Sequence, residues 1–95
     1  MHAEVRTTGS EAAILSRLIR PERDDLSPEA ARSILKLGFD DGDRARMHDL
    51  AVKAQAGSLD QAEQVEIESY RRVGRLLELM HSKARRSLKK VGLRP

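Results

Sequence analysis

Residues 60–91 read DQAEQVEIESYRRVGRLLELMHSKARRSLKKV, and this stretch decides the fold of the 95-residue chain. It contains no proline and one glycine, Gly74, and its apolar residues recur at helical spacing. One face of the helix that this spacing predicts is apolar, and the opposite face turns basic after Tyr70. At 1.5 Å per residue the helix is about 48 Å long. Such a helix suits contact with another helix or with a polyanion.

Two shorter helices near the N-terminus are marked by residues that start and stop helices. Ser10 is the expected N-cap of the first, and Pro21 ends it. Ser27 caps the second, with a proline at its first helical position. We expect Gly38 to stop this helix in the left-handed conformation and Phe39 to fold back onto it.

A third helix is expected over residues 41–56, and its stop at Gly57 precedes the long helix. Three acids lie at its start, where negative charge is favourable: Asp40, Asp41 and Asp43. Their spacing fails the calcium-loop pattern, so capping explains them better than a cation site. The long helix begins at Asp60, with Glu63 three residues later in a capping-box arrangement.

The fold class predicted from these patterns is all-α, a small helical bundle of about four helices with a long amphipathic C-terminal helix. Aromatic residues make up only 2% of the chain, which disfavours a β-sheet. The expected organisation is a flexible N-terminus over residues 1–9, a single helical domain over 10–91 and a C-terminal tail over 92–95. With no cysteine, disulfides and thiolate metal sites are excluded.

The net charge of +3 conceals a gradient along the chain. Residues 1–39 are balanced, and residues 40–69 carry three basic and eight acidic side chains. Residues 70–95 carry nine basic side chains and one acidic. The basic character therefore belongs to the C-terminal end of the chain.

Catalytic, metal and membrane motifs are missing from the sequence. There is no glycine-rich phosphate loop, and the histidines lack the spacing of a zinc site. No apolar run approaches the roughly 20 residues of a membrane span, and the N-terminus lacks the apolar core of a signal peptide. We expect a cytoplasmic, non-enzymatic protein with no cofactor, no metal, no small-molecule substrate and no membrane contact.

The apolar face of the long helix is the first candidate binding surface. Its stripe is longer than the three earlier helices can cover, so we expect self-association or a partner helix along it. Leu79 lies among basic residues on the other side and is a candidate anchor. The interface residues predicted are Val73, Leu76, Leu77, Leu79, Met80, Ala84 and Leu88.

The basic end of the same helix is the second candidate surface. The residues predicted to contact nucleic acid are Lys83, Arg85, Arg86, Lys89 and Lys90. Binding through phosphates would be indifferent to sequence, because the basic end of the helix offers no aromatic residue for stacking and the chain contains no asparagine to read adenine. The alternative is a solvated face at a helix C-terminus, where cations are favourable in any case.

A string of segments resembles a family of small, uncharacterised bacterial all-helical proteins that are often encoded beside HNH endonucleases. The resemblance covers roughly residues 11–90. The segments that carry it are ILSRLI (14–19), LSPEAAR (26–32), ILKLGF (34–39), RMHDLA (46–51), KAQAGSL (53–59), YRRVGRLL (70–77) and SKAR (82–85).

This resemblance implies an accessory or antitoxin-like partner of an HNH nuclease and no catalytic residue. The chain itself cannot be the nuclease, since that metal site needs asparagine and strands and this sequence lacks both signals. The predicted function is thus a helical protein–protein interaction module, with sequence-independent nucleic-acid binding by the basic C-terminal helix as the alternative.

Overall fold

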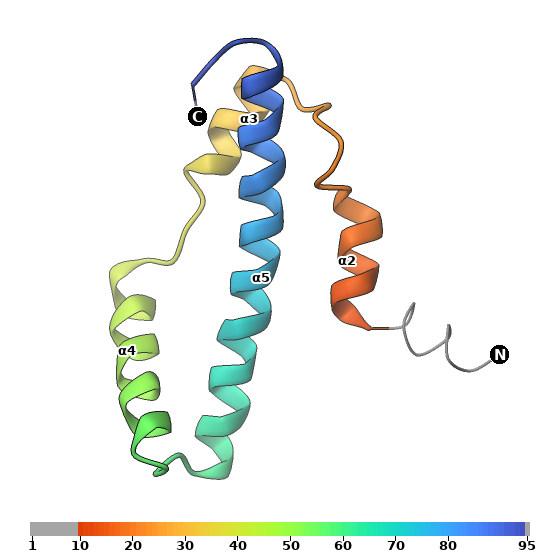
Figure 1. Ribbon diagram of the computed structural model, residues 1–95. Helices are drawn as coiled ribbons and strands as arrows, with labels where there is room; N and C mark the ends of the chain where they lie inside the picture. Colours follow the sequence, from red (N-terminus) through yellow and green to blue (C-terminus); the bar gives the residue numbers. More distant parts are fainter. Residues whose placement is uncertain (1–9, 95) are drawn as a thin grey trace, which may run out of the picture. The chain divides into compact units, whose positions relative to one another are not determined.

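The computed structural model describes residues 10–94, which form four helices and no strand (Figure 1). The helices are α2 (Glu11–Ile19), α3 (Pro28–Leu35), α4 (Asp41–Gln55) and α5 (Gln61–Lys90). The all-α prediction with a long C-terminal helix is confirmed. The segment 1–9, which was expected to be flexible, lies outside the described residues.

The N-terminal caps predicted from the sequence are all present. Ser10, Ser27 and Asp40 each accept a hydrogen bond from the backbone N–H three residues on, at 3.1, 3.2 and 2.8 Å. At the start of α5 the side chains of Asp60 and Glu63 accept from each other's backbone N–H, at 2.7 and 3.0 Å. These bonds satisfy backbone donors that a helix start leaves unpaired. The helix starts could be predicted because each bond joins residues only three positions apart in the sequence.

One predicted helix end is right and another is wrong. After α4, Gly57 adopts a φ of 69°, as expected for a glycine stop. Gly38, by contrast, is not in the left-handed region, because α3 has already ended at Leu35. The N–H groups of Lys36 and Leu37 bond back three residues, at 3.2 and 3.0 Å, and close α3 with a tighter turn.

The chain divides into two compact units, and α5 contributes to both. The terminal unit comprises the described residues up to Leu37 together with those from Arg75 onward, and the hairpin unit comprises Gly38–Gly74.

In the hairpin unit, charged side chains join α4 to the first part of α5. Arg46 donates two hydrogen bonds to Glu66, at 2.8 and 2.7 Å, and Lys53 donates to Glu63. These cationic partners, through direct hydrogen bonds, hold the pKa of both glutamates below the usual range. Leu50 is fully buried in this unit.

Two aromatic residues also meet in the hairpin unit. Phe39, which was expected to fold back onto the preceding helix, packs edge-on against Tyr70, with ring centroids 5.9 Å apart. The Tyr70 hydroxyl donates to Asp43 at 2.7 Å, and this bond raises the pKa of the tyrosine. The partner of Phe39 is therefore set by a residue far along the chain.

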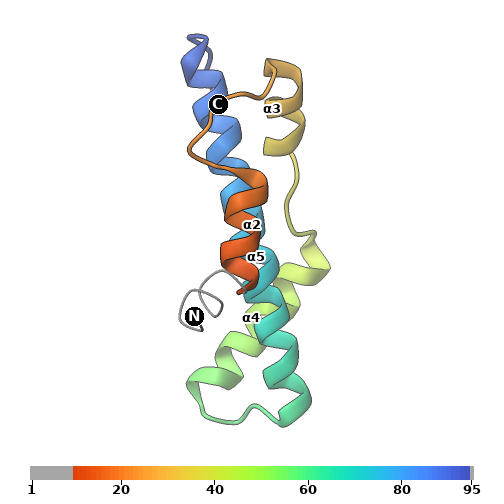
Figure 2. The ribbon, with the colours of Figure 1, turned by 90° about the vertical axis from the view of Figure 1, so that its right-hand side faces the viewer.

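In the terminal unit, α2 and α3 lie on different sides of α5 (Figures 1 and 2). The core forms where α3 meets the last turns of α5, and Ala31, Ala84 and Leu88 are fully buried there. The partly buried residues packed against them are Leu26, Ile34 and Leu35. Ala31 of α3 thus shares one buried cluster with Ala84 and Leu88 of α5.

Replacing Leu88 by alanine should destabilise the chain by about 2–5 kcal/mol, because the substitution leaves a cavity in a small core. Leu18→Ala removes the same atoms from a side chain that is 77% exposed, so it should change the unfolding free energy by less than about 0.5 kcal/mol. Urea unfolding followed by circular dichroism measures both. Equal effects of the two substitutions would contradict the placement of the core.

Candidate interaction surfaces

Lys83 connects α5 to the end of α2. Its ammonium group donates to the backbone oxygen of Ile19 at 2.7 Å and to the carboxylate of Asp25 at 2.8 Å. Arg20 ends α2 in the left-handed conformation, and the N–H of Arg23, which would reach the Ile19 oxygen if the helix continued, bonds to the Arg20 oxygen at 3.0 Å. The lysine supplies that missing donor, so its side chain is only 14% exposed.

Ser87 lies one turn further along the same side of α5 and holds the same connector. Its hydroxyl accepts from the N–H of Leu26 at 3.1 Å and donates to the backbone oxygen of Lys83 at 2.9 Å. Ser87 is buried, and both bonding directions of its hydroxyl are used. Two side chains spaced i, i+4 therefore pin the segment between α2 and α3 to α5.

These contacts divide the predicted nucleic-acid residues into two groups. Lys83 is bonded within the fold, and Lys90 lies 3.4 Å from the carboxylate of Asp24 in an exposed ion pair. The side chains of Arg85, Arg86 and Lys89 remain exposed, and among residues 10–94 no hydrogen bond or ion pair engages them. The structure thus separates cations that stabilise the fold from cations that face solvent.

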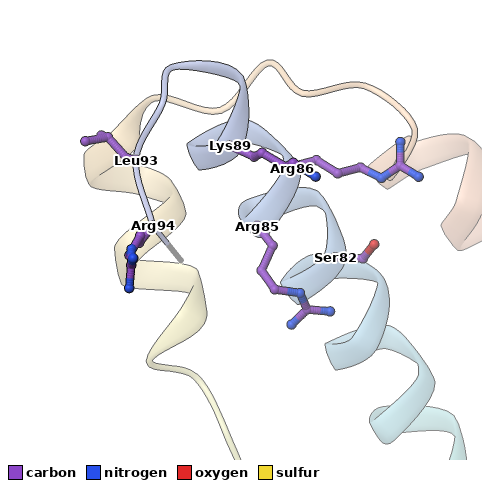
Figure 3. Close-up of a pocket in the computed structure, with 6 residues that line it drawn as sticks. All are labelled: Ser82, Arg85, Arg86, Lys89, Leu93 and Arg94. Atoms are coloured by element: carbon purple, nitrogen blue, oxygen red, sulfur yellow. The ribbon is translucent and has the colours of Figure 1, made fainter.

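The exposed cations border a hollow of about 450 Å³ at the C-terminal end of α5 (Figure 3). Its lining residues are Ser82, Arg85, Arg86, Lys89, Leu93 and Arg94. Three of these, Ser82, Leu93 and Arg94, were not among the predicted site residues. Helical periodicity could not place the last two, because they follow the end of α5.

The residues of the predicted apolar interface also fall into two groups, those that remain at least partly exposed and those that are fully buried. Val73 is exposed, and Leu76, Leu77, Leu79 and Met80 are half-buried. Ala84 and Leu88 are fully buried against α3, so they belong to the chain's own core and not to an outward surface. This difference arises because α3, although short, packs on the last turns of α5 where the predicted stripe ends.

The surroundings of Leu79 also differ from the expectation, which was a single leucine exposed among basic residues. It lies one turn before Lys83 on the same face of α5, and that face reaches the end of α2 through the lysine. The half-buried state of Leu79 fits a position beside that contact. The structure therefore places Leu79 on a side that the chain itself partly covers.

An exposed apolar pair on α2 was not among the predicted interface residues. Leu18 is 77% exposed and Ile14 is 45% exposed, and they lie one turn apart on the same face. No residue of α2 is buried. The sequence does show an apolar face on this helix, but it cannot show which part of that face the rest of the chain leaves uncovered.

Within residues 10–94 no group of three or more histidine, aspartate and glutamate side chains could hold a metal ion. No helix in that range is long and apolar enough to cross a membrane.

His81 was expected at the surface or at its boundary, and its side chain is half-buried, with Nε2 2.8 Å from the backbone oxygen of Leu37.

Comparisons of the chain with protein-family models, with curated proteins and with solved structures find no match.

The Asp25–Lys83 contact makes a prediction about acid stability. The hydrogen bond from Lys83 holds the pKa of Asp25 below its ordinary value of 3.8. A carboxylate with a lowered pKa contributes stability that is present above the ordinary value and is lost as the pH falls through the folded value. Asp25→Asn should therefore flatten the dependence of melting temperature on pH below about pH 4.

Glu22→Gln is the matched control, because it removes an exposed carboxylate from the same connector that has no bonded partner among residues 10–94. Circular dichroism melts of both variants and the parent between pH 2.5 and 7 measure the effect. If Asp25→Asn follows the parent curve throughout this range, the contact does not stabilise the folded chain.

Proposed function

We propose that this chain is a non-enzymatic protein–protein interaction module that binds its partner through the exposed face of α2. The observation that supports the proposal most directly is the exposure of Leu18 and Ile14 on a helix with no buried residue. Single exposed leucines are ordinary on protein surfaces. Two large apolar residues one turn apart match the anchor spacing of a helix that docks in an apolar groove.

The length of α2 gives a physical reason for this assignment. Nine residues are too few for a stable isolated helix, so α2 depends on packing of its apolar face. Residues 10–94 cover that face incompletely, because Leu15 and Ile19 are half-buried while Leu18 stays exposed. Burying one such side chain in a partner is worth about 1.5–3 kcal/mol. Burial of Leu18 in a partner would thus contribute to the binding free energy and would also stabilise α2.

The resemblance to proteins encoded beside HNH endonucleases makes such a nuclease the first partner to test. Under this proposal the chain is an accessory or antitoxin-like subunit that grips the nuclease through α2. The part of α5 from Arg75 onward belongs to the same terminal unit as α2. Four of the predicted interface residues lie in that part and are half-buried, so they could extend the contact: Leu76, Leu77, Leu79 and Met80.

Leu18→Glu should lower the recovery of a co-expressed, neighbouring-gene HNH nuclease with the tagged chain by about tenfold or more, because a charge replaces an apolar anchor. Val91→Glu is the matched control, since it places the same charge on an exposed apolar residue outside α2. Sedimentation velocity of the parent and Leu18→Glu tests a second copy as the partner. Unchanged recovery and unchanged sedimentation with Leu18→Glu would reject α2 as the contact.

A second candidate function, sequence-independent nucleic-acid binding, is supported by a separate observation. Arg85, Arg86 and Lys89 have exposed side chains without any bonded partner among residues 10–94. Free cations of this kind bind phosphates with a steep dependence on salt.

The parent protein should retard a DNA duplex in a gel shift, and the triple substitution of Arg85, Arg86 and Lys89 to glutamine should abolish the retardation. Equal retardation by both proteins would reject this function.

A further inference from the structure

We propose that α2 of one copy of this chain docks in an apolar groove of the hairpin unit of a second copy, and that each copy of the pair receives the α2 of the other. Such a reciprocal pair is closed by a twofold axis, the commonest symmetry of soluble oligomers. The inference rests on the proposed function, because it names a partner for the exposed face of α2. A second copy and a nuclease would compete for that face.

The groove, called the hairpin groove below, is a hollow of about 560 Å³ formed by residues of α4 and of the first part of α5. All of its lining residues belong to the hairpin unit, and only Gln55 and Arg71 among them have strongly polar side chains. A hollow of this composition suits apolar side chains better than an ion. The lining residues are Met47, Ala51, Ala54, Gln55, Ile67, Tyr70, Arg71 and Gly74.

Charged bonds between α4 and α5 lie on the side of the hairpin away from the groove. Arg46 and Lys53 of α4 bond to glutamates of α5. At 100° per residue these two cations lie on one side of the buried Leu50, and the groove residues Met47 and Ala54 lie on its other side. The two sides of the helix pair therefore differ, since one is joined by ion pairs and the other is a hollow with an apolar lining.

Small residues give the hairpin groove its space. Ala51, Ala54 and Gly74 line it, and a Cβ added at Gly74 would have no atom of a neighbouring segment within 4 Å. The larger Ile67 also lines the groove and is only 8% exposed. Large side chains of a docked helix could fill the space beside the small residues, as side chains do in a packed interior.

The exposed face of α2 has the size and the side chains that this groove lacks. α2 has nine residues, and the groove extends over nine residues of α4, 47–55, so both are about 14 Å long. Leu18 and Ile14 are large, exposed and one turn apart. A helix that docks in an apolar groove uses anchors with this spacing.

The distribution of charge favours α2 of a second copy over a second hairpin unit as the occupant. Residues 38–74 carry five basic and eight acidic side chains, so the hairpin unit is negative. Residues 10–37 and 75–94, the described part of the terminal unit, carry twelve basic and six acidic side chains. Opposite charges steer unlike units together, whereas two hairpin units that meet groove to groove would repel each other.

Two substitutions each remove one half of the proposed contact. Leu18→Glu places a charge on α2 and leaves the groove intact, whereas Ala51→Phe fills the groove and leaves α2 intact. Ala45→Phe is the matched control, because it adds the same ring to an exposed alanine of α4 that does not line the groove. Sedimentation equilibrium at several protein concentrations gives the dissociation constant of the pair.

The parent should show a monomer–dimer equilibrium, and each of the two substitutions should raise its dissociation constant by about tenfold or more. Ala45→Phe should behave as the parent does. An equimolar mixture of Leu18→Glu and Ala51→Phe should form more dimer than either variant alone. In the mixture, α2 of the Ala51→Phe chain can dock in the intact groove of the Leu18→Glu chain, so one of the two contacts is restored.

Other results would overturn the inference and can be separated from failure of the proposed function. A parent that stays monomeric at millimolar concentration rejects it, while capture of the nuclease that depends on Leu18 would still support the function. If Leu18→Glu separates the pair and Ala51→Phe does not, α2 binds another surface of the second copy. If Ala51→Phe separates the pair and Leu18→Glu does not, the occupant is a second hairpin unit.

A second groove variant keeps the test decisive if Ala51→Phe fails to fold. Gly74→Leu fills the same groove from α5, where the added atoms have open space, and it should weaken the pair as Ala51→Phe does. Circular dichroism melts of all variants show whether a loss of dimer reflects only a loss of folding. A folded Gly74→Leu variant that pairs like the parent would reject the groove as the docking site.

Discussion

The bond from the Lys83 ammonium to the end of α2 is the interaction on which the arrangement of the terminal unit depends. It satisfies the Ile19 carbonyl, which has lost its helical donor because the N–H of Arg23 bonds to the Arg20 oxygen, and it pairs with Asp25. Ser87, one turn further on, holds the next part of the connector. With the connector fixed on this side of α5, α3 packs on another side and forms the core with Ala84 and Leu88.

The contacts of Lys83 show that the basic residues near the end of α5 are not equivalent. Some bond within the fold, and others remain exposed to solvent. The cations that face the connector are paired with its aspartates, whereas those that border the hollow have no partner among residues 10–94. A similar division applies to the apolar residues. The last turns of α5 are covered by α3, while Leu18 on α2 stays exposed. The surfaces available to a partner are therefore those that the chain's own packing has not used.

The helices and most of their ends could be predicted because they depend on neighbouring residues. Ser27 and Asp40 cap helices through bonds to the N–H three residues on, and Gly57 stops α4 by its own conformation. The predicted left-handed stop at Gly38 was wrong, because the N–H groups of Lys36 and Leu37 bond back three residues and close α3 before Gly38 is reached. Local signals identify where a helix can end, and competing local bonds decide where it does end.

The candidate sites were less predictable because they depend on contacts between distant parts of the chain. Lys83 meets Asp25 across 58 positions of sequence, and Phe39 meets Tyr70 in the same way. Helical spacing assigned Lys83 to a basic face and Leu88 to an apolar one, which is correct for an isolated helix. It could not show that α3 packs against Ala84 and Leu88 while the connector between α2 and α3 is bound by Lys83 and Ser87.

The reactivity of the lysines tests this account most directly. Reductive methylation of the folded chain, followed by mass spectrometry, gives a separate rate for each of Lys36, Lys53, Lys83, Lys89 and Lys90. The account predicts that Lys83 reacts more slowly than the exposed Lys89, and that urea or Asp25→Asn reduces the difference. Equal rates for Lys83 and Lys89 in the folded parent would contradict it, because they would show that Lys83 is as free as the cations proposed to bind nucleic acid.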